Sequence, residues 1–195
     1  MRYLEKFGLA AMAAMALMAF AASSASATAI YSGESKLGAG SIGDFSIPSG
    51  GSALLVDTEN ETLDTCTAST IQGKLTSAST GTMEELTWKN CTFPTTTITK
   101  GKLEVVWTGG TEGEAIVDAE IGVTINTVFF GSCIYGMTSG TKMGTITTFS
   151  SGAATLHSNA VAKKFSGSNV ACPETSKFTG TYTTTEPTNL RVEKE

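Results

Sequence analysis

The chain has 195 residues, of which 41% are hydrophobic and 16% are charged, and its formal net charge is −5 at pH 7. Beyond residue 29, threonine accounts for about one residue in five and glycine for about one in eight, a composition that favours strands and turns over helices. Because the charge balance is acidic and no basic stripe is present, we expect no nucleic-acid partner.

The N-terminal segment, residues 1–29, has the pattern of a secretory signal peptide. A charged start precedes an apolar stretch over residues 9–22, and small residues then offer cleavage after Ala27 or after Ala29. The apolar stretch is short for a membrane span and no later run is long enough, so we expect no span in the mature chain. These features predict a secreted, extracellular protein, either free or associated with the cell surface.

The rest of the chain has the pattern of short strands separated by turns. We expect an irregular Gly- and Ser-rich lead-in over residues 30–52 and a single domain over residues 53–195. The clearest strand is Glu114–Asn126, where apolar and polar positions alternate strictly from Val117 to Ile125. The expected strands, in chain order, are Ala53–Asp57, Met83–Cys91, Lys102–Thr108, Glu114–Asn126, Phe129–Tyr135, Lys142–Phe149, Ala153–Phe165, Lys177–Thr184 and Leu190–Glu193.

The four cysteines, Cys66, Cys91, Cys133 and Cys172, are expected to form two disulfides, which persist in an oxidising compartment. Three pairings are possible; we favour Cys66–Cys91 and Cys133–Cys172, because nearest-in-sequence pairs connect neighbouring strands. Each ring would stabilise the fold by roughly 3.5–4 kcal/mol. No CxxC motif is present, so we expect no metal site, redox pair or cofactor. Strands and cysteines together predict an all-β fold, a disulfide-stapled antiparallel β-sandwich, with a barrel as the less favoured alternative.

Catalytic motifs are weak in this sequence. His157 is the only histidine, it falls in an expected strand, and no GxSxG motif supplies a nucleophile. Acidic residues between Asp57 and Asp64 have a spacing that suits calcium, but the glycine of an EF-hand loop is missing, which favours a solvated loop. The carboxylates between Glu112 and Glu120 fit the solvent face of a strand better than a glycosidase pair. We therefore expect a protein that is not an enzyme, with a secreted hydrolase as the least favoured alternative.

Aromatic side chains are the candidates for ligand binding. Trp88 and Trp107 keep the phase of their apolar neighbours, so we expect them in the core. For Tyr135 and Tyr182, no such pattern predicts whether the side chain is buried or exposed, and each could stack on a sugar ring if it were exposed. A carbohydrate-binding module that uses Tyr135 and Tyr182 is therefore the main alternative function.

Several short segments within residues 50–192 carry a resemblance to known proteins. They are Cys66–Ser69, Leu86–Cys91, Gly131–Gly136, Cys172–Pro173, Phe178–Tyr182 and Pro187–Val192. These segments resemble a family of small secreted, largely uncharacterised, cysteine-containing β proteins of actinobacteria. The chain is more loosely similar to secreted biofilm-associated β proteins of the alkane-oxidation-activator type. The family resemblance implies export, β structure and disulfides, and it supplies no catalytic residues.

The function we expect is that of a secreted, non-enzymatic protein of the cell surface or extracellular matrix. Such a protein would act through its surface or through unpaired edge strands. A threonine-rich surface suits this role, because it is uncharged, forms hydrogen bonds and is compatible with strand pairing. The partners we expect are a second copy of the chain or a surface polysaccharide.

Overall fold

The protein is built from antiparallel strands, and the part of the chain that the structure describes contains no helix. The computed structural model describes residues 27–57, 59, 61–93, 95–99, 101–127, 130–148 and 152–195. Its strands are β1 (Thr28–Ser32), β2 (Ser35–Lys36), β3 (Ile42–Ser46), β4 (Ala53–Val56), β5 (Thr62–Leu75), β6 (Thr80–Cys91), β7 (Thr95–Thr99), β8 (Lys102–Gly109), β9 (Glu112–Ala119), β10 (Ile121–Thr127), β11 (Gly131–Met137), β12 (Lys142–Thr147), β13 (Thr155–Lys164), β14 (Thr175–Glu186) and β15 (Leu190–Lys194).

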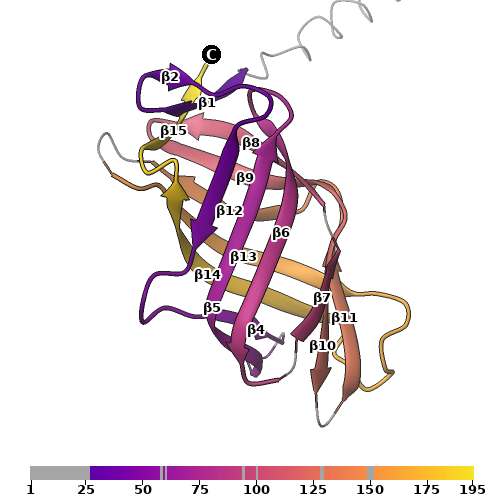
Figure 1. Ribbon diagram of the computed structural model, residues 1–195. Coiled ribbons are helices and arrows are strands. Elements are labelled where there is room, and N and C mark those ends of the chain that lie inside the picture. The colour runs from indigo at the N-terminus through magenta and orange to yellow at the C-terminus, as the bar shows by residue number, and fades with distance from the viewer. Residues whose placement is uncertain are drawn as a thin grey trace, which may run out of the picture.

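The strands form one small and one large sheet. The small sheet has the order β15-β1-β2, and the large sheet has the order β3-β14-β4-β5-β6-β8-β9-β12-β13-β11-β10-β7. Because β13 also pairs with β14, the hydrogen-bonded order that runs from β14 through β5 and β9 to β13 closes on itself. Figure 1 shows β5 and β6 in front, crossing over β12, β13 and β14 behind, so that two layers face each other as in a β-sandwich.

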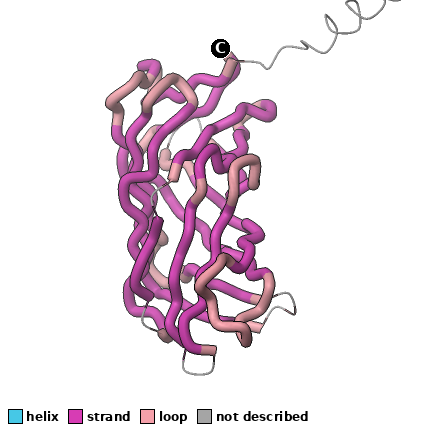
Figure 2. Tube along the Cα trace, turned by 90° about the vertical axis from the view of Figure 1, so that its right-hand side faces the viewer, coloured by secondary structure: helices cyan, strands magenta, loops and turns pink. Residues whose placement is uncertain are grey.

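The two ends of the molecule differ. The small sheet and the C-terminus lie at one end, and β7, β10 and β11 lie at the other (Figure 1). Figure 2, seen from a direction 90° away, shows that strands make up most of the trace and that the molecule is elongated between these ends. The small sheet is thus placed to cover one open end of the space between the layers.

Strand β13 illustrates how the sequence produces the layers. Its alternate positions from Leu156 to Ala162 are buried, whereas those from His157 to Lys163 are exposed. A period of two places one face of a strand against the opposite layer and the other face in water. The apolar area that the inner face buries stabilises the fold by roughly 25 cal/mol per Å².

A cluster of aromatic rings joins the two layers in the core. Trp88 of β6 stacks on Phe178 of β14 with ring centroids 5.4 Å apart, and Phe178 in turn lies 6.2 Å from the ring of Tyr182. The hydroxyl of Tyr182 makes a 3.0 Å hydrogen bond with that of Ser69 in β5. Ring pairs of this kind stabilise a core beyond the area that they bury. Trp88 and Trp107 both pack against the core, as predicted.

The expected all-β class, antiparallel pairing and two disulfides are confirmed, and one expected strand is divided. The run Glu114–Asn126 forms two strands that separate at Glu120. Strand β9 pairs with β8 and β12, whereas β10 pairs with β11 and β7. The apolar alternation continues through the break because both strands bury the same side of the chain, so the sequence pattern carries no signal of the change in partners.

The expectation of an irregular lead-in over residues 30–52 is wrong. Strand β3 lies between β5 and β14, and β1 pairs along its whole length with β15. Thr28 and Ala29 belong to β1, and the Thr28 hydroxyl accepts a 2.8 Å hydrogen bond from the backbone N–H of Trp107. Of the two cleavage positions expected from the sequence, the one after Ala27 would leave β1 whole.

Candidate functional site

Both disulfides have the pairing favoured from the sequence. Cys66 and Cys91 are directly opposite each other on β5 and β6, with Cα atoms 3.9 Å apart. Cys133 of β11 is bonded to Cys172, in the segment between β13 and β14, with Cα atoms 5.8 Å apart. No cysteine is free. Two disulfides are compatible with an extracellular location, because such bonds persist in oxidising compartments.

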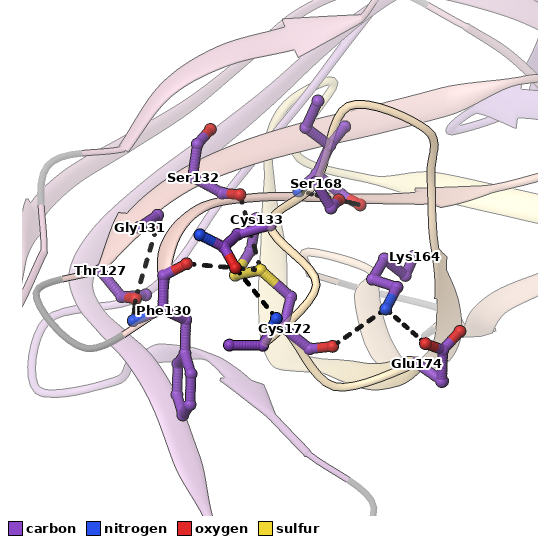
Figure 3. The surroundings of a disulfide bond; sticks show 12 residues. Thr127, Phe130, Gly131, Ser132, Cys133, Lys164, Ser168, Cys172 and Glu174 are labelled. Carbon is purple, nitrogen blue, oxygen red and sulfur yellow. Dashed lines mark hydrogen bonds and ion pairs between the residues drawn. A yellow bond between two sulfur atoms is a disulfide. The ribbon is translucent and has the colours of Figure 1, made fainter.

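Strand β13 pairs with β11 only at Tyr135 and Gly136. The segment between β13 and β14, residues 165–174, covers the edge that the earlier part of β11 leaves open; we call it the edge loop (Figure 3). The backbone N–H of Ile134 donates a 2.8 Å hydrogen bond to the hydroxyl of Ser168, and that hydroxyl donates to the Ile134 carbonyl at 3.0 Å. The backbone N–H of Asn169 donates to the carbonyl of Ser132 at 2.9 Å. The edge loop thus occupies groups that a further strand would need for pairing.

Covalent and ionic contacts hold the edge loop in place (Figure 3). Cys172 tethers it to Cys133 on β11, and both side chains are buried. At the base of the loop, the ammonium group of Lys164 donates to the carbonyl of Cys172 at 3.2 Å and also pairs with the carboxylate of Glu174. The edge of β11 is therefore closed by main-chain, side-chain and covalent contacts together.

Strand β7, in contrast, is an open edge. Strand β10 pairs with one side of it, and no strand of the described part pairs with the other side. Its residues, Thr95–Thr99, are four threonines and one isoleucine. Natural sheets usually protect an edge with charges, proline or bulges; β7 has one register shift, opposite Thr124 and Ile125, and no charge or proline.

An apolar cavity of about 100 Å³ lies between the two layers, beside the small sheet. The front layer contributes Phe45 and Met83 to its wall, the back layer contributes Ile146, and the small sheet contributes Val192. Lys74 is the one charged residue among those that line it. A lining of this kind excludes water and suits an apolar group.

A polar hollow of about 450 Å³ lies on the outer face of β13 and β14. It is lined by His157 and Asn159 of β13, by Thr179 and Thr181 of β14, and by the segment before β4. The imidazole Nδ1 of His157 lies 3.2 Å from the Thr181 hydroxyl. No carboxylate lines the hollow among the described residues. The neighbouring Ser158 is buried and donates to the carbonyl of Met143 at 2.9 Å, so its hydroxyl is turned away from His157.

Tyr135 and Tyr182, the residues expected to stack on a sugar, are fully buried, so the expectation that they form an exposed binding surface is wrong. Tyr182 shares the inward phase of Phe178 and bonds to Ser69. Burial raises the pKa of Tyr135 to about 12, with Asp57 and Glu174 adding to the effect, and burial likewise raises the pKa of Tyr182. Both phenols are therefore part of the core.

The acidic segment after β4 folds as a turn. One carboxylate oxygen of Asp57 accepts hydrogen bonds from the backbone N–H groups of Glu59 and Glu61, at 2.9 and 2.8 Å. Asp64 is not part of this turn, because it lies buried in β5. It is close to the sulfur atoms of Cys66 and Cys91, but a disulfide provides no thiolate for a metal ion.

The carboxylates of β9 belong to the surface. Glu114 forms a 2.6 Å ion pair with Lys142 of the neighbouring strand β12. Asp118 and Glu120 are exposed. This arrangement agrees with the solvent face expected for the strand.

Three features of the structure were not predicted from the sequence: the open edge of β7, the apolar cavity and the polar hollow. The run Thr95–Thr99 carries a signal for a strand, because β-branched residues favour the pleated conformation. The cavity carries no local signal, since its lining comes from strands distant in sequence. The hollow likewise depends on the pairing of β13 with β14.

Comparisons with known proteins give no relative from which a function can be transferred: no protein-family model matches the sequence, and searches of curated proteins and of solved structures find no similar protein. Among the described residues, no helix has the length and apolar character needed to cross a membrane.

Proposed function

We propose that this chain is an exported, non-enzymatic protein of the cell surface or extracellular matrix that binds an extended strand through the open edge of β7. A second copy of the chain is the partner we favour. The observation that carries the proposal is the uncharged strand Thr95–Thr99 at the end of the large sheet. Strand addition needs main-chain hydrogen-bonding groups on one free side, and no strand of the described part pairs with the second side of β7.

The other edges support this choice by contrast. The edge loop covers β11, and β15 carries Arg191, Glu193 and Lys194, charges that oppose edge-to-edge pairing. Strand β2 has only two residues, too short for a stable pairing. Strand β7 is therefore less protected against pairing with a second chain than β11, β15 and β2 are.

Antiparallel pairing of β7 with β7 of another copy favours a dimer over a fibre. When β7 of one copy pairs antiparallel with β7 of another, a two-fold axis relates the copies and both open edges are used. A fibre would instead require β7 of one copy to pair with a different edge of the next copy. The proposed assembly is therefore a closed pair, and its contacts are independent of salt because the facing strands carry no charge.

Sedimentation equilibrium of the purified protein over a concentration series, at low and at high salt, tests the proposal. We expect a monomer–dimer equilibrium whose dissociation constant does not change with salt. Thr97→Lys places like charges opposite each other in the dimer, so it should weaken association at low salt and recover part of it at high salt. Thr67→Lys adds the same charge at an exposed position of β5 and is the matched control. A protein that stays monomeric at high concentration contradicts the proposal.

The polar hollow favours carbohydrate binding as a second candidate function. Imidazole, amide and hydroxyl groups of His157, Asn159 and Thr181 converge there, and such groups pair with sugar hydroxyls. We expect Asn159→Ala to abolish any glycan-array signal, whereas Lys163→Ala, further along the exposed face of β13, should not change it. Absence of any signal for the parent protein would remove this candidate.

A further inference from the structure

The apolar cavity between the layers exists because glycines occupy three positions where neighbouring strands turn side chains inward. Gly43 of β3 is directly opposite Gly73 of β5, and Gly73 is in turn opposite Met83 of β6, which is buried. Gly81 lies one inward position further along β6, opposite Leu75. All three glycines line the cavity. Three adjacent inward positions without side chains leave space that the surrounding core does not fill.

The cavity is empty at Gly43 and is lined mainly by apolar side chains. A Cβ atom on Gly43 would meet no heavy atom within 4 Å. The residues around the cavity are dominated by aliphatic and aromatic side chains such as Ile71, Leu103 and Leu156. An apolar cavity of about 150 Å³ is large enough to bind benzene, so the cavity of about 100 Å³ seen here takes a short alkyl segment rather than a large ligand.

The opening of the cavity carries a positive charge. Ile42 and Lys74 are directly opposite each other on β3 and β5, both line the cavity, and both are exposed, so they mark where it approaches solvent. No aspartate or glutamate lines the cavity among the described residues, and the ammonium group of Lys74 makes no ion pair with them. An apolar interior beneath an unpaired cation matches an apolar tail that ends in an anion.

We propose that this cavity binds a small fatty-acid-like amphiphile, with the end of its alkyl chain between the layers and its carboxylate beside Lys74. The apolar chain supplies the affinity through the area that it buries. The exposed ion pair supplies a modest preference for the carboxylate over a neutral head group. This site lies at the small-sheet end of the molecule, whereas β7 lies at the opposite end (Figure 1), so the inference is independent of the proposed function.

The test is a titration of the full protein with octanoate and with octanol, followed by NMR of the methyl groups of Ile71, Leu103 and Ile146. We expect these methyl signals to shift and saturate with both ligands. Octanoate should bind about fivefold more tightly than octanol, the ratio that corresponds to an exposed ion pair of about 1 kcal/mol. If the cavity methyl signals do not shift at millimolar ligand, the proposal is wrong.

Two variants separate the two parts of the site. Lys74→Met should bring octanoate to the affinity of octanol and leave octanol binding unchanged; because Lys74 is exposed, this change leaves the core intact. Gly43→Leu fills the cavity and should abolish binding of both ligands, whereas Gly38→Leu adds the same side chain at an exposed loop position with open space around it. Equal binding by Gly43→Leu and Gly38→Leu, or an unchanged preference for octanoate in Lys74→Met, would overturn the assignment.

Discussion

Removal of the Cys133–Cys172 disulfide tests whether this bond keeps the edge of β11 closed. The change is Cys133→Ala with Cys172→Ala. The cysteines are 39 residues apart, and a ring of this size stabilises a fold by roughly 4 kcal/mol through the entropy of the unfolded chain. We expect the free energy of unfolding, measured with urea, to fall by about this amount.

The other disulfide provides a control of nearly equal size. Cys66 and Cys91 are 25 residues apart, which corresponds to roughly 3.5 kcal/mol. The two cysteines lie opposite each other on β5 and β6, strands that stay paired over the rest of their register, from Ala68 to Leu75. Their removal should therefore lower global stability and leave the edge loop in place.

Amide hydrogen exchange distinguishes the two double variants. In the parent protein, the N–H of Ile134 bonds to Ser168 and the N–H of Asn169 bonds to Ser132. Without Cys133–Cys172, the loop can leave β11 without unfolding the rest, so both amides should exchange by local opening. Without Cys66–Cys91, they should exchange only by global unfolding.

Self-association of the two double variants is a second test of whether the Cys133–Cys172 disulfide keeps the edge of β11 closed. An uncovered β11 edge presents free main-chain groups to other molecules, so the variant without Cys133–Cys172 should form larger species at high concentration while the variant without Cys66–Cys91 does not. If both variants keep the Ile134 amide protected and form the same species as the parent protein, the disulfide acts only on the unfolded chain and the edge argument is refuted.

Three further predictions concern the core. Ser69→Ala removes the hydrogen-bond partner of the Tyr182 hydroxyl and should lower the urea unfolding free energy by about 1–3 kcal/mol; an unchanged value would contradict it. Gly144→Ala would place its Cβ atom 2.4 Å from the carbonyl oxygen of His157, so we expect a loss above about 3 kcal/mol in the same assay. Because the pKa of Tyr135 rises from 10.0 to about 12 on folding, stability should be complete below pH 10 and fall as pH approaches 12; Tyr135→Phe should reduce this fall in far-UV circular dichroism.

Strands with one uniformly apolar face could be predicted from the sequence. Strand β13 comes close to this pattern: Leu156, Ala160 and Ala162 are buried, and Ser158 is the one polar residue among its inward positions. The disulfide pairing was predicted for a related reason. Neighbouring strands in an antiparallel fold are mostly consecutive in the chain, so nearest-in-sequence cysteines are also close in space.

Strands whose inward positions are not apolar were missed. The longest strand, β5, places Ser69 and Gly73 inward, where one bonds to Tyr182 and the other leaves cavity space. A short strand such as β3, with Gly43 inward, shows no alternation for the same reason. The sequence does not place Tyr182 in the core, although it lies on the inner face of β14 together with Phe178. Gly180 and Thr184 lie on the same face, and because neither is a large apolar residue, the face shows no clear apolar pattern. Partner strands, rather than local sequence, decide the conformation of these segments.

The distribution of edge protection in this fold is an argument about function. Closing the hydrogen-bonded order between β13 and β14 removes most edges, and those that remain are treated differently. The edge of β11 has a covering loop, an ion pair and one of the two disulfides, while β15 has charges. Strand β7 has one register shift but neither a charge nor a disulfide, although a single lysine would protect it further. A weakly protected edge favours aggregation, so its presence beside two strongly protected ones supports the proposal that a strand binds there.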